Sequence, residues 1–180
     1  MTTSAHFVAH RDVMRGIGTF ILLLGWSATA VAAEVSVKIP QEGWSISFES
    51  PSLSQKEESK RNGDYSFRAN SGRFNISLFV EKPHGPGRSH KDCYAFYWPQ
   101  ARRNPMIAKD TVEASETPKF VRVQYDTVAQ FQGKPIRQRH VNYYFAFRGR
   151  WVDVHISIIA PSEQDVDVFE TFDRTLSYGP

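Results

Sequence analysis

Apolar and polar side chains alternate along five segments of this chain, and this alternation is the tightest constraint on its fold. The segments cover residues 44–48, 73–81, 121–131, 141–147 and 152–158. A period of two sends successive side chains to opposite faces of an extended strand, whereas an amphipathic helix repeats every ~3.6 residues. The sequence therefore predicts a domain built mainly from half-buried β-strands.

Glycine-containing turns indicate how these strands connect. Asn70-Ser71-Gly72 predicts a hairpin formed by Asp64–Ala69 and Arg73–Glu81, preceded by the polar, lysine-rich segment Pro51–Gly63. Gln132-Gly133-Lys134 predicts a reversal after the long strand of residues 121–131.

The last hairpin has a definite expected register. When Gly149 is the first residue of a two-residue type II′ turn, Phe147 pairs with Val152. This register places Tyr144 opposite His155, and it also places Asn142 opposite Ser157.

Two helices are expected between and after the strands. Ser89 and Asp92 have the spacing of a capping box, which predicts a helix from His90 to about Arg103, interrupted at Pro99. After Pro161, Ser162 and Asp165 repeat the capping pattern before an apolar stripe at helical spacing, made of Phe169, Phe172 and Leu176. Strands and helices together predict an α+β fold.

Three features together resemble a known fold family. They are the strand Trp44-Ser45-Ile46-Ser47-Phe48 leading to Pro51, the middle helix, and the hairpin strand Gly149–Ile156 followed by the Phe169–Leu176 helix. The combination looks like the fold shared by the PsbP extrinsic proteins of photosystem II and the nuclear Ran-binding Mog proteins. The resemblance implies a central antiparallel sheet sandwiched by helices (α/β/α), used as a non-catalytic partner-binding module. No binding residues of that family can be carried over.

The N-terminal segment has the order of a secretory signal peptide. Arg11 and Arg15 precede an uncharged apolar run, which ends in small residues at Ala28–Ala33. We expect cleavage after Ala32 or Ala33, so that residues 34–180 form one exported domain in the periplasm or outside the cell. The alternative to cleavage is an uncleaved membrane anchor. If translation starts at Met14, residues 1–13 are an upstream extension that is not part of the signal peptide.

Charge and cysteine content narrow the function classes. The chain has 22 Lys and Arg against 19 Asp and Glu, a formal net charge of +3. This balance predicts no strong attraction to nucleic acid or to an anionic membrane. The single cysteine, Cys93, precludes an intramolecular disulfide framework and is interpreted as a buried helix residue.

Polar residues on the strand faces opposite the apolar rows form the candidate binding surface. Under the expected register this surface collects Arg122, Tyr144, Asp153 and His155, to which we assign the recognition of a partner. The alternative is a hydrolase that uses His140, Asp153, His155 and Ser157. Ser157 lies within a strand, however, without the sharp turn that usually presents a nucleophile and its oxyanion donors.

A third reading is a metal carrier. His84, His90 and Cys93 are donor types that suit zinc, but their spacing matches no closed four-ligand motif. The leading expectation is therefore a non-enzymatic binding or accessory module for a protein or small ligand of the cell envelope. It would need no cofactor and no metal, and it would not stay inserted in the membrane after signal cleavage.

Overall fold

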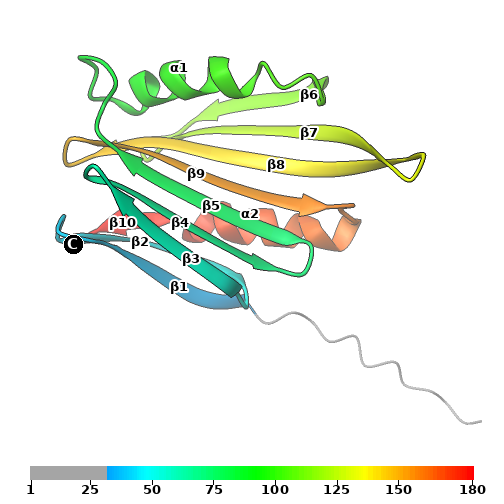
Figure 1. The fold of residues 1–180 in the computed structure, drawn as a ribbon, viewed down its shortest axis with the longest axis horizontal. Helices are drawn as coiled ribbons and strands as arrows, with labels where there is room; N and C mark the ends of the chain where they lie inside the picture. The colour runs from blue at the N-terminus through cyan, green and yellow to red at the C-terminus, as the bar shows by residue number, and fades with distance from the viewer. Residues whose placement is uncertain (1–31) are drawn as a thin grey trace, which may run out of the picture.

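The computed structural model describes residues 32–180, which form two antiparallel sheets and two main helices (Figure 1). The expected signal peptide therefore lies outside the described residues, apart from Ala32 and Ala33. The elements run in this order: β1 (Ala32–Ile39), β2 (Trp44–Pro51), β3 (Ser54–Arg61), β4 (Asp64–Ser71), β5 (Phe74–Glu81), α1 (His90–Ala101), β6 (Ile107–Glu116), β7 (Val121–Phe131), β8 (Lys134–Phe147), β9 (Arg150–Ile159), a 3-10 turn (Glu163–Asp165), α2 (Val166–Thr175) and β10 (Ser177–Gly179).

The larger sheet has seven strands in the order β3-β4-β5-β9-β8-β7-β6, and the smaller has three in the order β1-β2-β10. Neighbours in both sheets are antiparallel. The expected α+β character is confirmed, but two antiparallel sheets dominate the fold and the arrangement is not a clear α/β/α sandwich. The smaller sheet was not anticipated, and it shares a face of the larger sheet with α2 (Figure 1).

Adjacent residues of β8 and β9 show why the larger sheet needs cover on both faces. Phe145 and Val152 lie in the core beneath α2 and the smaller sheet. Their neighbours Tyr144 and Trp151 lie in a second apolar cluster with Cys93 of α1. Because neighbouring side chains of a strand point to opposite faces, each of these two strands supplies both cores.

Both capping boxes form as expected. Ser89 accepts from the Asp92 amide at the start of α1, and Ser162 and Asp165 bond reciprocally ahead of α2. Phe169, Phe172 and Leu176 are buried in the core, as their spacing predicts. Helix α1 ends at Ala101 and contains Pro99, so it is slightly shorter than expected.

The expected register of the last hairpin is wrong by two residues. Phe147 pairs with Arg150 rather than with Val152, and the two turn residues Arg148 and Gly149 have φ of 47° and 73°. Two positive φ values are typical of a type I′ turn, whereas type II′ requires only the first. Because the shift is even, every side chain keeps its expected face. Its partners change: Tyr144 lies opposite Asp153, Asn142 opposite His155, and His140 opposite Ser157.

Strand β3 lies in the segment described above only as polar and lysine-rich. It forms one edge of the larger sheet, and all of its residues are exposed. No helix of residues 32–180 is long and apolar enough to cross a membrane.

Candidate functional site

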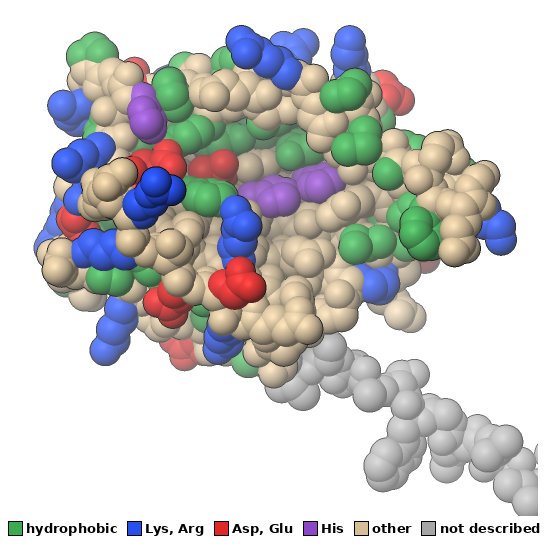
Figure 2. Space-filling view, viewed as in Figure 1, with side chains coloured by type: hydrophobic (Ala, Val, Ile, Leu, Met, Phe, Trp, Pro, Cys, Tyr) green, Lys and Arg blue, Asp and Glu red, His purple; other side chains and the backbone are tan. Residues whose placement is uncertain are grey.

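The larger sheet is only partly covered on its α1 face. Helix α1 packs mainly on β8 and less on β9 and β7, so β3, β4 and much of β5 extend beyond it (Figure 1). Figure 2 shows this face as hollowed beside the helix, with histidine side chains adjacent to one another near its middle. The open half of the face is where a ligand could approach the sheet.

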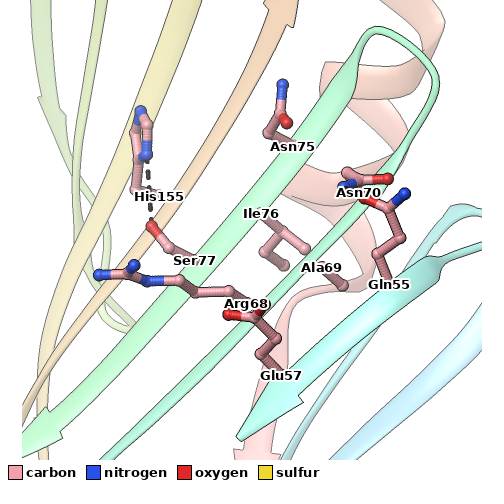
Figure 3. Close-up of a pocket in the computed structure, with 9 residues that line it drawn as sticks. All are labelled: Gln55, Glu57, Arg68, Ala69, Asn70, Asn75, Ile76, Ser77 and His155. Carbon is pink, nitrogen blue, oxygen red and sulfur yellow. Dashed lines mark hydrogen bonds between the residues drawn. The ribbon is translucent and has the colours of Figure 1, made fainter.

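A pocket of about 270 Å³ lies on this open half. Figure 3 shows that its polar side chains come from four consecutive strands of the sheet, with Gln55 and Glu57 on β3, Arg68 and Asn70 on β4, Asn75 and Ser77 on β5, and His155 on β9. The register explains this gathering, because Glu57, Arg68, Ser77 and His155 pair in turn across the sheet. One ladder row therefore forms a continuous polar floor.

A chain of hydrogen-bonding side chains runs from the pocket toward α1. Ser77 Oγ lies 3.5 Å from Nδ1 of His155, and Nε2 of His155 lies 2.9 Å from Nδ1 of His140. Nε2 of His140 in turn lies 2.9 Å from Thr127 Oγ1. Four strands are cross-linked in this way, since these residues belong to β5, β9, β8 and β7.

Both histidines are held in the neutral form. Burial lowers the pKa of His140 from 6.5 to about 4, against a weaker opposing effect of the Asp126 carboxylate. Burial lowers the pKa of His155 to about 3, and the neighbouring His140 adds to the shift. A neutral imidazole has one donor and one acceptor nitrogen, so each ring can be satisfied by the two partners it has in the chain.

Asp153 lies two residues before His155 on the same face of β9, nearer α1, and its pKa shifts in the opposite direction. It accepts a hydrogen bond from Asn142 Nδ2 at 2.8 Å. Burial raises its pKa from 3.8 to about 7, opposed by the Asn142 bond and assisted by the charge of Glu81. Glu81 itself accepts from the Tyr97 hydroxyl of α1. Burial therefore favours the protonated form of Asp153 far more than that of an exposed carboxyl.

The structure separates the four residues assigned above to one binding surface. His155 and Asp153 are half-buried on the α1 face, and Tyr144 is on the same face but fully buried in the apolar cluster beneath α1. Arg122 lies on the opposite face, where its Nε donates to Asp173 of α2 at 2.8 Å. Placing Arg122 with the other three is corrected accordingly.

The residues of the hydrolase alternative are neighbours without forming a triad. Ser157 is buried and its Oγ accepts from Gln138 Nε2 at 2.8 Å, while Asp153 bonds Asn142 rather than either histidine. The serine whose hydroxyl lies within 3.5 Å of a histidine ring nitrogen is Ser77, beside His155. Strand β5 is paired on both sides, so the Ser77 amide lies within a ladder and is not presented as an oxyanion donor.

The residues of the metal alternative have separate structural contacts. His84 stacks on Phe96, and His90 accepts from the Ala146 amide on Nδ1 while its Nε2 lies 3.1 Å from the Pro118 carbonyl. Cys93 is buried, and burial raises the pKa of its thiol to about 12. Among residues 32–180, no three His, Cys, Asp or Glu residues gather closely enough to hold a metal ion.

Sequence reasoning missed most of the pocket lining. Asn75 and Ser77 alternate with the apolar row of β5, so their face was available from the pattern. The pattern does not reveal the face of Gln55 and Glu57, because β3 is exposed on both sides and shows no alternation. Arg68 was not singled out, since a lone exposed arginine is ordinary for a protein surface.

Comparisons with known proteins give distant likenesses in structure only. No family model matches the chain, and no curated protein matches it in sequence. A Bacteroides thetaiotaomicron protein of known structure superposes with a TM-score of 0.41 at 14% identity, covering 75% of this chain and 45% of that one. LpqN, involved in cell envelope biogenesis of Mycobacterium tuberculosis, superposes with a TM-score of 0.49 at 15% identity, covering 83% and 92%.

Proposed function

We propose that this chain is an exported, non-enzymatic binding module, distantly related to the PsbP and Mog fold family, and that it holds a polar ligand in the pocket on the open half of the larger sheet. The observation that carries the proposal is the pocket's lining of polar side chains from four strands. A rigid sheet fixes these groups in place, which lowers the entropy lost when a ligand binds.

Several polar groups of the lining remain free to contact a ligand. The Arg68 guanidinium is exposed, lies over the Phe79 ring at 5.7 Å, and has no hydrogen bond or ion pair with any described residue. Glu57 likewise has no ion-pair partner in the described chain, whereas the Asn70 and Gln55 amides are already bonded to each other at 2.8 Å. A cation, an anion and amides close together suit a ligand with several hydrogen-bonding groups, recognised by orientation more than by net charge.

The same geometry favours binding over catalysis. His140 and His155 are uncharged and hydrogen-bonded to each other. Asp153, the acid whose pKa is raised, contacts Asn142 and not a base. A general base needs a pKa near the working pH and a proton to abstract within reach. His155, with a pKa of about 3, is a weak base for activating Ser77.

Site-specific photocrosslinking in the producing cell tests the proposal. A photoreactive amino acid in place of Asn75 should give a covalent adduct, while the same amino acid at exposed Arg174 of α2 should not. Arg68→Ala should abolish the Asn75 adduct and leave the melting temperature nearly unchanged, because Arg68 is exposed. No adduct at Asn75 beyond that at Arg174 would remove the basis for the pocket.

A serine-directed probe tests the non-enzymatic part. A fluorophosphonate should not label the purified protein, since Ser77 lacks both a competent base and oxyanion donors. Labelling that Ser77→Ala eliminates would show that the protein is a hydrolase instead.

A further inference from the structure

The free edge of β6 differs from the free edge of β3 at the other end of the larger sheet. Strand β3 has the sequence SQKEESKR, so charged side chains occupy most of its length. The last part of β6, Glu113–Glu116, contains Ala114 and Ser115 between its two carboxylates. Charges along an edge oppose the addition of another strand, and small uncharged residues do not.

The ladder shows which backbone groups of β6 point outward. The Thr117 amide donates to the Phe120 carbonyl at 2.9 Å, so this pair is bonded across the hairpin. In an antiparallel ladder bonded and non-bonded pairs alternate. Ala114 and Glu116, which lie opposite Val123 and Val121, therefore direct their amides and carbonyls toward the free edge.

A groove flanks this edge on each face of the sheet, and the two grooves meet at Ser115. On the α1 face a groove of about 420 Å³ is lined by Tyr94, Ala95, Ala114 and Val121, with the Lys91–Glu116 ion pair at one side. On the α2 face a second groove of about 420 Å³ is lined by Ser115, Arg122, Phe169, Glu170 and Asp173. The first is therefore mainly apolar and the second polar.

We infer that the β6 edge docks an extended segment of a partner protein, which adds to the larger sheet as an eighth, antiparallel or parallel, strand. Main-chain hydrogen bonds to Ala114 and Glu116 provide affinity in this mode. Alternate side chains of the added strand enter the two grooves and provide specificity. The surface is separate from the pocket proposed above and does not depend on it.

Charge determines what the segment should contain. In the second groove Arg122 is paired with Asp173 at 2.8 Å, whereas Glu170 has no ion-pair partner among the described residues. Glu113 lies opposite Gln124 on the same face and also has none. The docked strand therefore presents Lys or Arg to the α2 face and Val, Ile or Leu to the α1 face.

The same charges disfavour a second copy of this chain as the occupant. Two copies paired antiparallel with Ala114 opposite Ala114 set Glu113 of each copy opposite Ser115 and diagonal to the other copy's Glu113 on the α2 face. A second copy therefore brings another carboxylate, and no Lys or Arg from its own Glu113–Glu116 segment, to the side of the edge where Glu113 and Glu170 lie.

Titration with designed peptides tests the inference. A ten-residue peptide of alternating Val and Lys should bind the purified protein, and alternating Val and Glu should bind about tenfold more weakly or worse. Methylating the amides along one edge of the Val-Lys peptide keeps its pattern and charge, yet it should weaken binding by a similar factor. Amide hydrogen exchange should slow at Ala114 and Glu116 when the peptide binds.

Two variants localise the site. Ala95→Trp fills the apolar groove and should weaken binding about tenfold, whereas Gln100→Trp adds the same side chain to the exposed face of α1 and should not. Ala114→Pro removes an outward donor that β7 does not use, so the melting temperature should hold while binding falls.

Two results would overturn the inference. One is binding that survives both Ala95→Trp and Ala114→Pro, or exchange protection that lies away from β6. The other is a dimer in sedimentation that Ala114→Pro dissociates, which would identify a second copy as the occupant.

Discussion

At the residue scale, the paired histidines make stability depend on pH. The folded pKa values of His140 and His155, about 4 and about 3, lie below the unfolded value of 6.5. The unfolded chain therefore takes up protons that the folded chain refuses, and stability present above about pH 6.5 is lost as the pH falls toward 4.

Replacing one of these rings should flatten that dependence. In urea titrations at pH 7 and pH 4.5, His155→Gln should lose less free energy of unfolding on acidification than the parent. Glutamine cannot titrate but can still donate to and accept from the neighbouring side chains. Parallel losses in parent and variant would mean that the histidines titrate normally in the folded protein.

The effect of Asp153 on stability should depend on pH with the opposite sign to that of the histidines. Its folded pKa of about 7 lies above the reference value of 3.8, so its stabilising contribution is lost as the pH rises through 7. Asp153→Asn mimics the protonated form and should raise the melting temperature most at pH 8, less at pH 5, and little near pH 3.

Buried Asp126 is the matched control for that change. It accepts from Arg139 at 3.0 Å, so Asp126→Asn should lower the melting temperature at pH 8. A drop of similar size in Asp153→Asn would show that the Asp153 carboxylate is stabilising when charged.

At the scale of single elements, Gly149 is required in the turn between β8 and β9 by its backbone conformation and not by lack of space for a side chain. Gly149 has φ of 73°, and a Cβ added there meets nothing within 4 Å. Gly149→Ala should therefore cost about 1–2 kcal/mol through the left-handed conformation and not through a clash. Gly179→Ala is the control, because it is equally uncrowded without a positive φ. Equal effects in thermal denaturation would contradict the turn assignment.

Helix α2 should contribute to stability through its buried aromatic stripe. Phe172 is completely buried and contacts Phe48 and Tyr143, so Phe172→Ala should cost about 3–5 kcal/mol by leaving a cavity. Val166 at the start of α2 is 42% exposed, and Val166→Ala should change the free energy of unfolding far less. Chemical denaturation of both variants measures the difference.

The alternation of residues predicted most strands but could not assign their faces. Strand β7 has an apolar row at Val121 and Val123, and its alternation alone predicts this row on the same side as Val141 of β8. In the structure Val123 lies opposite Asn142, beneath α1, whereas Val141 lies in the other core. A period of two identifies which residues share a face, and when both faces are covered it does not say which helix covers them.

Strands β3 and β6, which the sequence did not predict, lack that alternation. Strand β3 is exposed on both sides, and β6 has a register shift between Ala108 and Glu113 that interrupts its pattern. The Gln55 and Glu57 side of the pocket and the free β6 edge both depend on these strands. Reading the sequence could therefore identify His155 and Asp153 but not the surfaces around them.

At the scale of the whole molecule, export is the prediction that the N-terminal sequence makes. Protein recovered from the producing cells should begin at Ala33 or Glu34, because small residues precede both sites. Mass spectrometry of the intact protein measures this directly. Detection of the Phe20–Trp26 segment in the recovered protein would instead indicate an uncleaved anchor.

The contrast between the two ends of the larger sheet limits how this protein can assemble. Open-ended polymers of β-sheet proteins need two receptive edges on each molecule, so that every added copy offers a new place for growth. The charged β3 strand closes one end of the larger sheet, and β6 is its receptive end. Any association that extends the larger sheet should therefore stop after one addition, which prevents this sheet from growing end to end into a fibre.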